Sequence, residues 1–112
     1  MNFLELLFAL LVGHALCDFP LQGDYLSRGK NHKQPIPGSP WWILLIAHAL
    51  IHGGAVALVT GSVAFGVAET VVHALIDRAK CNGDISYEAD QAAHVLFKIL
   101  WAGLLVIAGA PQ

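Results

Sequence analysis

Charged residues are scarce in this sequence. Only 12% of its 112 residues are Asp, Glu, Lys or Arg, whereas soluble domains carry about 25%. Hydrophobic residues make up 56% of the chain, and the mean hydropathy is +0.62. A chain with so little charge cannot cover a surface that faces water, which excludes an ordinary soluble domain. The composition therefore predicts that the lipid bilayer surrounds the protein.

Basic residues and sulfur are also in short supply. Six Lys and Arg residues give a formal net charge of −2, and no basic patch is interleaved with aromatic residues, so a nucleic-acid-binding surface is excluded. The two cysteines do not define a redox compartment. The first residues lack the basic region of a signal peptide, so we expect the amino-terminal segment to remain as a mature helix.

Four apolar stretches are each close to the ~20 residues with which a helix crosses a bilayer. They cover residues 2–22, 41–60, 62–80 and 86–108. A basic loop with three prolines, residues 23–40, is expected to be non-helical. Short turns join the other stretches, so neighbouring helices should be antiparallel. The sequence therefore predicts one domain, residues 1–112, with an all-α fold: a polytopic membrane protein built as a four-helix transmembrane bundle.

The cations give this bundle an orientation. Arg28, Lys30 and Lys33 lie in the first connection, and Arg78 and Lys80 lie near the third. Because loops rich in Lys and Arg stay in the cytoplasm, both termini are predicted to be non-cytoplasmic.

Ionisable residues interrupt every apolar stretch in pairs spaced four positions apart. The pairs are His14 and Asp18, His48 and His52, His73 and Asp77, and Asp90 and His94. Residues with this spacing share one face of a helix. Exposing them to lipid costs about 2.5 kcal/mol or more for each charge. All four pairs are therefore expected to face the interior of the bundle.

Chain direction gives the pairs a common order. The first and third stretches run toward the cytoplasm with His before Asp, and the fourth runs away from it with Asp before His. The three aspartates should therefore lie at one level, and their histidines one turn, roughly 5–6 Å, deeper. His48 and His52 of the second stretch fit the same two levels, that of the aspartates and that of the deeper histidines. Eight candidate ligands are thus predicted to meet near one face of the membrane.

Imidazole and carboxylate groups are common ligands of first-row metals, and facing helices hold dimetal centres with such groups. Without abundant sulfur or a redox cofactor, this set favours Zn²⁺, although Mn²⁺ or Fe²⁺ would accept the same ligands. Eight ligands exceed one tetrahedral site. Either two ions share bridging carboxylates, or one ion is bound and the remaining residues orient its ligands.

Two further charged residues fall at the same depth. Glu69 precedes His73 by one turn and Lys98 follows His94 by one turn, so Glu69 and Lys98 are predicted to approach each other. One interpretation is a neutralising salt bridge between helices. The other makes Glu69 or Asp90 a catalytic general base, or Glu69 an additional ligand.

Four sequence runs carry a resemblance to a known family. They are LVGHALCDFPLQ from Leu11, WWILLIAHALIHG from Trp41, ETVVHALIDRAK from Glu69 and DQAAHVLF from Asp90. These runs resemble domain of unknown function 3307, a family of small bacterial and bacteriophage membrane proteins. The resemblance implies a location in the bacterial inner (plasma) membrane and the importance of the paired residues. A fainter similarity to bacterial membrane-bound metal-dependent hydrolases points to hydrolysis.

The expected function is therefore a metal-dependent hydrolase that acts on an ester, phosphoester or amide of a lipid or membrane peptide. A second hypothesis is a metal-ion or proton transporter or channel, whose pathway would require a homo-oligomer. A third is a regulatory membrane protein with a structural metal. Polar packing between helices is a further explanation of the paired residues.

Overall fold

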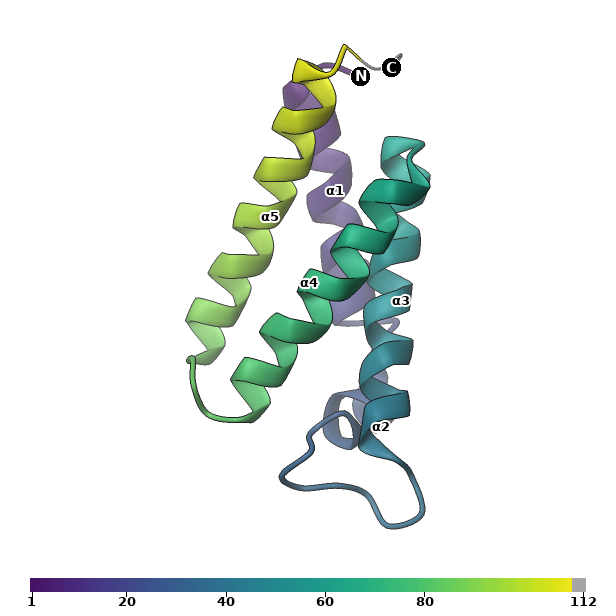
Figure 1. Cartoon of the computed structure of the whole chain (residues 1–112), viewed down its shortest axis with the longest axis vertical. Helices are drawn as coiled ribbons and strands as arrows, with labels where there is room; N and C mark the ends of the chain where they lie inside the picture. Colours follow the sequence, from purple (N-terminus) through teal and green to yellow (C-terminus); the bar gives the residue numbers. More distant parts are fainter. Residues whose placement is uncertain (110–112) are drawn as a thin grey trace.

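Five α-helices and no strand occur in residues 1–109, the part of the chain that this computed structural model describes. The helices are α1 (Phe3–Asp18), α2 (Gly23–Gly29), α3 (Trp41–Thr60), α4 (Val63–Cys81) and α5 (Tyr87–Ile107). The predicted all-α class is confirmed. The four long helices lie side by side, and the start of α1 and the end of α5 share one end of the molecule, opposite α2 (Figure 1).

Polar caps define where three of the four long helices begin, α1, α4 and α5. Asn2 and Glu5 form a reciprocal capping box at the start of α1. The side chains of Ser62 and Ser86 each accept a backbone hydrogen bond at the starts of α4 and α5. Gly61 ends α3 in a left-handed conformation, with φ of 69°, which suits glycine and permits the tight turn into α4.

The expectation that residues 23–40 form a non-helical connection is wrong for residues 23–29, which form α2. Asp24 and Arg28 pair along this helix at 3.3 Å, and the first proline of the connection is Pro35. The preceding helix ends at Asp18 rather than at residue 22, because Pro20 disfavours helical geometry at Phe19. The axes of α1 and α2 meet at 83°, so α2 lies across the end of the long helices.

Two helices are long and apolar enough to cross a membrane. They are α3, with a mean hydropathy of 2.0, and α5, with 1.4. The amino-terminal helix meets the same test only together with α2, as a pair bent between them. By composition, α4 does not qualify, since it contains two acidic and two basic residues. The apolar helices are consistent with membrane association.

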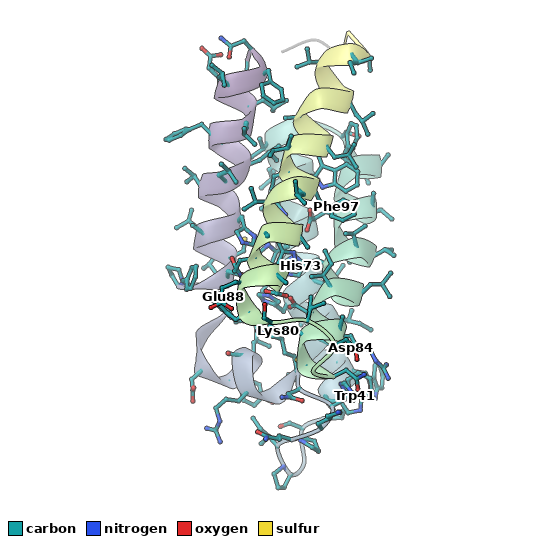
Figure 2. All side chains as sticks on the ribbon, turned by 90° about the vertical axis from the view of Figure 1, so that its left-hand side faces the viewer. Trp41, His73, Lys80, Asp84, Glu88 and Phe97 are labelled. Carbon is teal, nitrogen blue, oxygen red and sulfur yellow. The ribbon has the colours of Figure 1, made fainter. Side chains whose placement is uncertain are left out.

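Large apolar side chains lie on the outside of the molecule. Leu4, Phe8, Leu58 and Ile107 are between 71% and 86% exposed. Figure 2 shows such side chains projecting outward along the helices, while His73 lies between the helices. A water-soluble protein places its large apolar groups inside, so this distribution also fits a protein surrounded by lipid.

An apolar cluster fills the interior at the end that carries the amino terminus. It consists of Leu6, Leu10, Val56, Trp101, Ala102 and Leu105, each at most 6% exposed. These residues come from α1, α3 and α5. The ionisable residues occupy the remainder of the interior, toward α2.

Two glycines bring α3 and α4 into close contact. A Cβ atom added at Gly66 would lie 2.7 Å from the Gly53 carbonyl oxygen and 2.8 Å from the Ala57 Cβ atom. A Cβ atom at Gly53 would meet the Thr70 side chain and the Gly66 carbonyl oxygen. Small residues of this kind let helices pack closely where lipid supplies no hydrophobic driving force. The helices therefore meet backbone to backbone at this crossing.

Replacing Gly66 with alanine should lower the free energy of unfolding by about 1–3 kcal/mol, because the added methyl group meets backbone that cannot move aside. Thermal unfolding of the purified protein measures the effect. Gly54→Ala is the matched control, since a Cβ atom at Gly54 has no neighbour within 4 Å, and should leave stability unchanged or raise it by up to about 1 kcal/mol. Equal melting temperatures for the two variants would contradict the close approach.

Candidate metal centre

The described interior contains an unusual number of ionisable side chains. Five histidines, four carboxylates and two lysines are at most 9% exposed. They are His14, His48, His52, His73, His94, Asp18, Glu69, Asp77, Asp90, Lys30 and Lys98. All eight side chains predicted as metal ligands are in this set. Burying so many polar groups is costly unless each is paired, hydrogen-bonded or bound to an ion.

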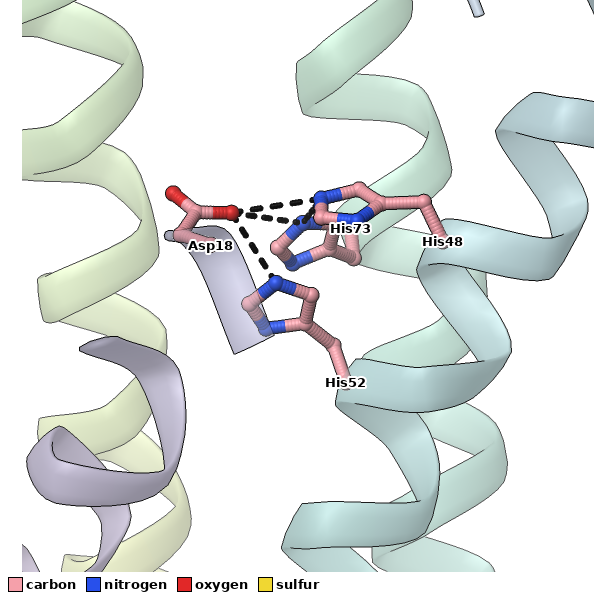
Figure 3. A group of neighbouring side chains, drawn as sticks. All are labelled: Asp18, His48, His52 and His73. Atoms are coloured by element: carbon pink, nitrogen blue, oxygen red, sulfur yellow. Dashed lines mark hydrogen bonds and ion pairs between the residues drawn. The ribbon is translucent and has the colours of Figure 1, made fainter. Parts of the chain in front are cut away.

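Four of these side chains point their ligand atoms at one another, and we call them the histidine-rich group: Asp18, His48, His52 and His73 (Figure 3). The Asp18 Oδ1 atom lies 3.2 Å from His48 Nε2, 2.9 Å from His52 Nε2 and 3.9 Å from His73 Nε2. The Nε2 atoms of His48 and His73 are 3.3 Å apart. Three histidine nitrogens and one carboxylate oxygen, from α1, α3 and α4, therefore converge.

These separations suit one tetrahedral ion. A tetrahedron with bonds of about 2.0–2.1 Å, typical of zinc with nitrogen and oxygen ligands, has edges of about 3.3–3.4 Å. The contacts from Asp18 Oδ1 and between His48 and His73 range from 2.9 to 3.9 Å. These ligand-atom separations are therefore close to those that a four-coordinate divalent ion requires.

Glu69 contacts His73 at Nδ1, the ring nitrogen that does not face the other members of the histidine-rich group. Its Oε2 atom is 3.0 Å from His73 Nδ1, and its Oε1 atom accepts hydrogen bonds of 2.8 Å from Lys98 Nζ and Trp101 Nε1. With its Nδ1 proton held by Glu69, His73 presents the lone pair of Nε2 to the group. The predicted approach of Glu69 and Lys98 is confirmed, and both Glu69 oxygens are engaged.

A second cluster lies next to the first, and we call it the aspartate-rich group: Asp77, Asp90 and His94. The His94 Nε2 atom is 3.1 Å from Asp77 Oδ1 and 3.3 Å from Asp90 Oδ1. These residues come from the end of α4 and the first two turns of α5. Two carboxylates and one imidazole thus also converge.

Asp77 belongs to both clusters. Its Oδ1 atom faces His94, whereas its Oδ2 atom lies 3.5 Å from His48 Nε2 and 3.6 Å from His73 Nε2. The Lys30 ammonium, at the end of α2, donates a 2.7 Å hydrogen bond to the same Oδ2 atom. One carboxylate therefore connects the histidine-rich group, the aspartate-rich group and α2.

Of the predicted ligands, His14 lies beside these clusters rather than within them. Its Nε2 atom is 3.0 Å from Gln91 Oε1 and 3.5 Å from Asp18 Oδ2. The Gln91 amide donates a 2.8 Å hydrogen bond to the same Asp18 oxygen. His14 and Gln91 thus hold the carboxylate of Asp18 from the side opposite to the histidine-rich group.

Sequence reasoning missed Lys30, Gln91 and Trp101. Lys30 was explained as one of the cations that set membrane orientation, yet it is 3% exposed and paired with Asp77. Gln91 is uncharged and does not fit the four-residue spacing. Trp101 does follow Lys98 by three positions on α5, so its place on the same helix face was the only available signal.

Three imidazole rings form a stack through the site. The ring centroids of His52 and His73 are 3.6 Å apart with an interplanar angle of 22°, and those of His73 and His94 are 4.0 Å apart with an angle of 19°. Two positive charges at this spacing would repel each other strongly away from water. The stack therefore disfavours protonation of two neighbouring rings at once, and the neutral ring is the form that binds metals.

A cavity of about 450 Å³ lies at the α2 end of the molecule. Its lining includes Asp18, Asp77, Asp90, Gln91 and Lys30. The three histidines of the histidine-rich group do not line it and are at most 1% exposed. The three aspartates thus line this space although each is at most 9% exposed, and the three histidines do not reach it.

Comparison with known proteins places the chain in a family. The profile of the family described as "Protein of unknown function (DUF3307)" matches residues 6–110, and the chain belongs to this family. No curated protein and no solved structure shows a significant match. The family membership predicted from the paired motifs is confirmed, and the family description assigns no activity.

Proposed function

We propose that this member of the family is a multi-pass protein of the bacterial inner membrane, with all four long helices crossing the bilayer and both termini non-cytoplasmic. The apolar exterior of the helices supports this arrangement. The two carboxylates within α4, Glu69 and Asp77, point inward and are at most 2% exposed. Arg78 and Lys80 lie in the last turn of α4, which ends at the same end of the molecule as α2 (Figure 1), as the positive-inside rule requires for a cytoplasmic face.

The centre of this protein is proposed to hold Zn²⁺ in the histidine-rich group. The observation that carries the proposal is the convergence of three imidazole Nε2 atoms on the Asp18 Oδ1 atom. Nitrogen and oxygen ligands in a tetrahedral arrangement favour zinc, and Mn²⁺ or Fe²⁺ would accept the same atoms. Glu69 then acts by orienting His73 rather than as the general base.

Charge balance supports a divalent ion at this place. The buried carboxylates outnumber the buried lysines by two in the described interior when the histidines are neutral. Unpaired charges in such surroundings cost several kcal/mol each. One divalent cation supplies the two missing positive charges, and the imidazole stack disfavours supplying them by protonation of neighbouring histidines.

The activity that best fits this centre is hydrolysis of an ester, phosphoester or amide in a lipid or membrane peptide. A bound divalent ion would supply Lewis acidity that activates water and polarises the scissile group, and one of the four protein ligands would have to give way, because catalytic zinc keeps a position open for water. Asp90 lines the cavity and would take the proton from the attacking water. The cavity at the α2 end admits a headgroup from the cytoplasmic leaflet, and Gln91 and His14 hold Asp18 in place.

The shape of the interior favours this proposal over transport. The cavity lies at the α2 end, while the apolar cluster around Leu6 and Trp101 fills the opposite half. A transporter needs access from both sides, which a single chain with this described interior would not provide.

Elemental analysis of the protein purified in lipid nanodiscs tests the proposal. We expect at least one zinc ion per chain, and removal of zinc with a chelator should lower the melting temperature because the buried carboxylates lose their counter-ion. Phospholipid vesicles and membrane peptides are then tested for hydrolysis that depends on added zinc. Protein without stoichiometric metal would refute the centre, and zinc without any hydrolysis would refute the enzyme.

A further inference from the structure

We infer that the aspartate-rich group binds a second divalent cation, joined to the first by the Asp77 carboxylate. This inference rests on the proposed zinc centre for its partner ion, to which Asp77 Oδ2 would add a fifth ligand beside the four of the histidine-rich group. Asp90 and His94 belong to the second site alone. Ligand atoms of Asp77, Asp90 and His94 all lie within 4.8 Å of one another. The group contains three protein ligands and leaves coordination positions for water or substrate.

The strongest support is a carboxylate oxygen without a hydrogen bond. Asp90 is 1% exposed, and its Oδ1 atom has no hydrogen-bond partner among the described residues. This atom points toward His94, whose Nε2 atom is 3.3 Å away. Leaving a buried carboxylate oxygen unsatisfied costs about 1–3 kcal/mol or more. A cation between Asp90, Asp77 and His94 would satisfy it, and Asp90 would then act as a ligand of that ion instead of as the general base.

The two oxygens of Asp77 provide the bridge. Oδ1 faces the aspartate-rich group and Oδ2 faces the histidine-rich group. Carboxylates that divide their oxygens in this way hold paired ions about 3.5–4 Å apart in two-metal enzymes. The Lys30 ammonium bound to Oδ2 keeps the carboxylate in this orientation. Asp77 is therefore placed to serve both ions at once.

The two groups differ in the metal they favour. Three imidazoles and one carboxylate suit zinc, whereas two carboxylates and one imidazole suit a harder ion such as Mn²⁺. Asp77 and Asp90 also line the cavity, so the second ion would be the one that meets the substrate. Two divalent ions would change the two-charge deficit into a two-charge excess, which a phosphomonoester dianion would neutralise and a phosphodiester would reduce to one charge. The substrate class is therefore a phosphoester, drawn from a lipid headgroup.

Manganese binding to the zinc-loaded protein tests the second site. Full-length protein in nanodiscs is loaded with zinc and titrated with Mn²⁺ while electron paramagnetic resonance records free Mn²⁺. We expect one Mn²⁺ per chain. Asp90→Asn and, independently, His94→Gln should weaken Mn²⁺ binding by more than the roughly 10–100-fold that loss of an outer-shell partner causes, while zinc is retained. Retained zinc also shows that each variant is folded.

Glu88→Gln is the matched control, because Glu88 lies two positions from Asp90 on the same helix and is exposed. It should bind Mn²⁺ as the wild type does. Zinc binding without Mn²⁺ binding would overturn the second site and leave the zinc centre intact. Unchanged Mn²⁺ affinity in Asp90→Asn or His94→Gln would also overturn it. A wild-type protein that binds neither ion would refute the proposed function itself.

Discussion

Replacing Asp18 with asparagine should weaken zinc binding about 100-fold. The Oδ1 atom of Asp18 is the point on which the three histidine nitrogens converge. Structural zinc sites with four ligands have binding free energies of about 10–16 kcal/mol. One ligand therefore accounts for roughly 3 kcal/mol, which corresponds to a change of about 100-fold in affinity. Asparagine has the same shape but no charge, so the variant also removes one of the negative charges that the ion balances.

Competition with a chromogenic zinc chelator measures this affinity in nanodiscs. Asp24→Asn is the control, because it makes the same chemical change on α2 where the side chain of Asp24 is 81% exposed, and it should bind zinc normally. Circular dichroism at matched temperatures would show whether both variants retain their helices. An Asp18→Asn protein that is folded and binds zinc with wild-type affinity would exclude the histidine-rich group as the metal site.

Replacing Lys98 with methionine should destabilise the protein by about 3–5 kcal/mol, because it leaves Glu69 as a buried charge without its cation. Lys98 and Glu69 are at most 1% exposed and 2.8 Å apart. The double variant Lys98→Met/Glu69→Leu removes both charges and should recover part of the lost stability, because Trp101 Nε1 and His73 Nδ1 then lack their acceptor. Its zinc affinity should nevertheless fall about 10–100-fold, since His73 no longer has the partner that fixes its Nδ1 proton.

Thermal unfolding of the three proteins, each with zinc and with chelator, separates these effects. Lys33→Met is the control for the loss of a lysine, because Lys33 is exposed and donates a hydrogen bond to the Asn82 carbonyl at the surface. It should unfold within about 0.5 kcal/mol of the wild type. A double variant that is no more stable than Lys98→Met would show that the two side chains do not act as a pair.

Much of the fold could be predicted from hydropathy and from the prolines and glycines that flank the helices. The predicted second helix, residues 41–60, has the observed bounds of α3, because proline precedes it and glycine follows it. The short α2 was missed, since seven residues are too few to show an amphipathic period and glycine stands at both ends. Its formation depends on packing against α3, which local sequence does not reveal.

The candidate site was predictable in composition but not in its connections. The four-residue spacing identified which side chains share a helix face, because that depends only on helical geometry. Which carboxylate meets which imidazole depends on how each helix is rotated against its neighbours. Asp18 therefore contacts His48 and His52 of another helix as well as its own partner His14. The contact between Lys30 and Asp77 could not be predicted from the sequence, because the position of Lys30 depends on the bend between α1 and α2.

The close crossing of α3 and α4 at Gly53 and Gly66 has a consequence for biosynthesis. In the proposed membrane, α4 would enter the bilayer with two carboxylates, at a cost of several kcal/mol if it entered alone. The tight turn at Gly61 makes α3, the most hydropathic helix, its immediate companion. His48 of α3 would then offer polar contacts to His73 and Asp77 of α4 during insertion. In that case the insertion machinery would handle these two helices as one hairpin, with the polar face of α4 turned toward α3 until α5 is inserted.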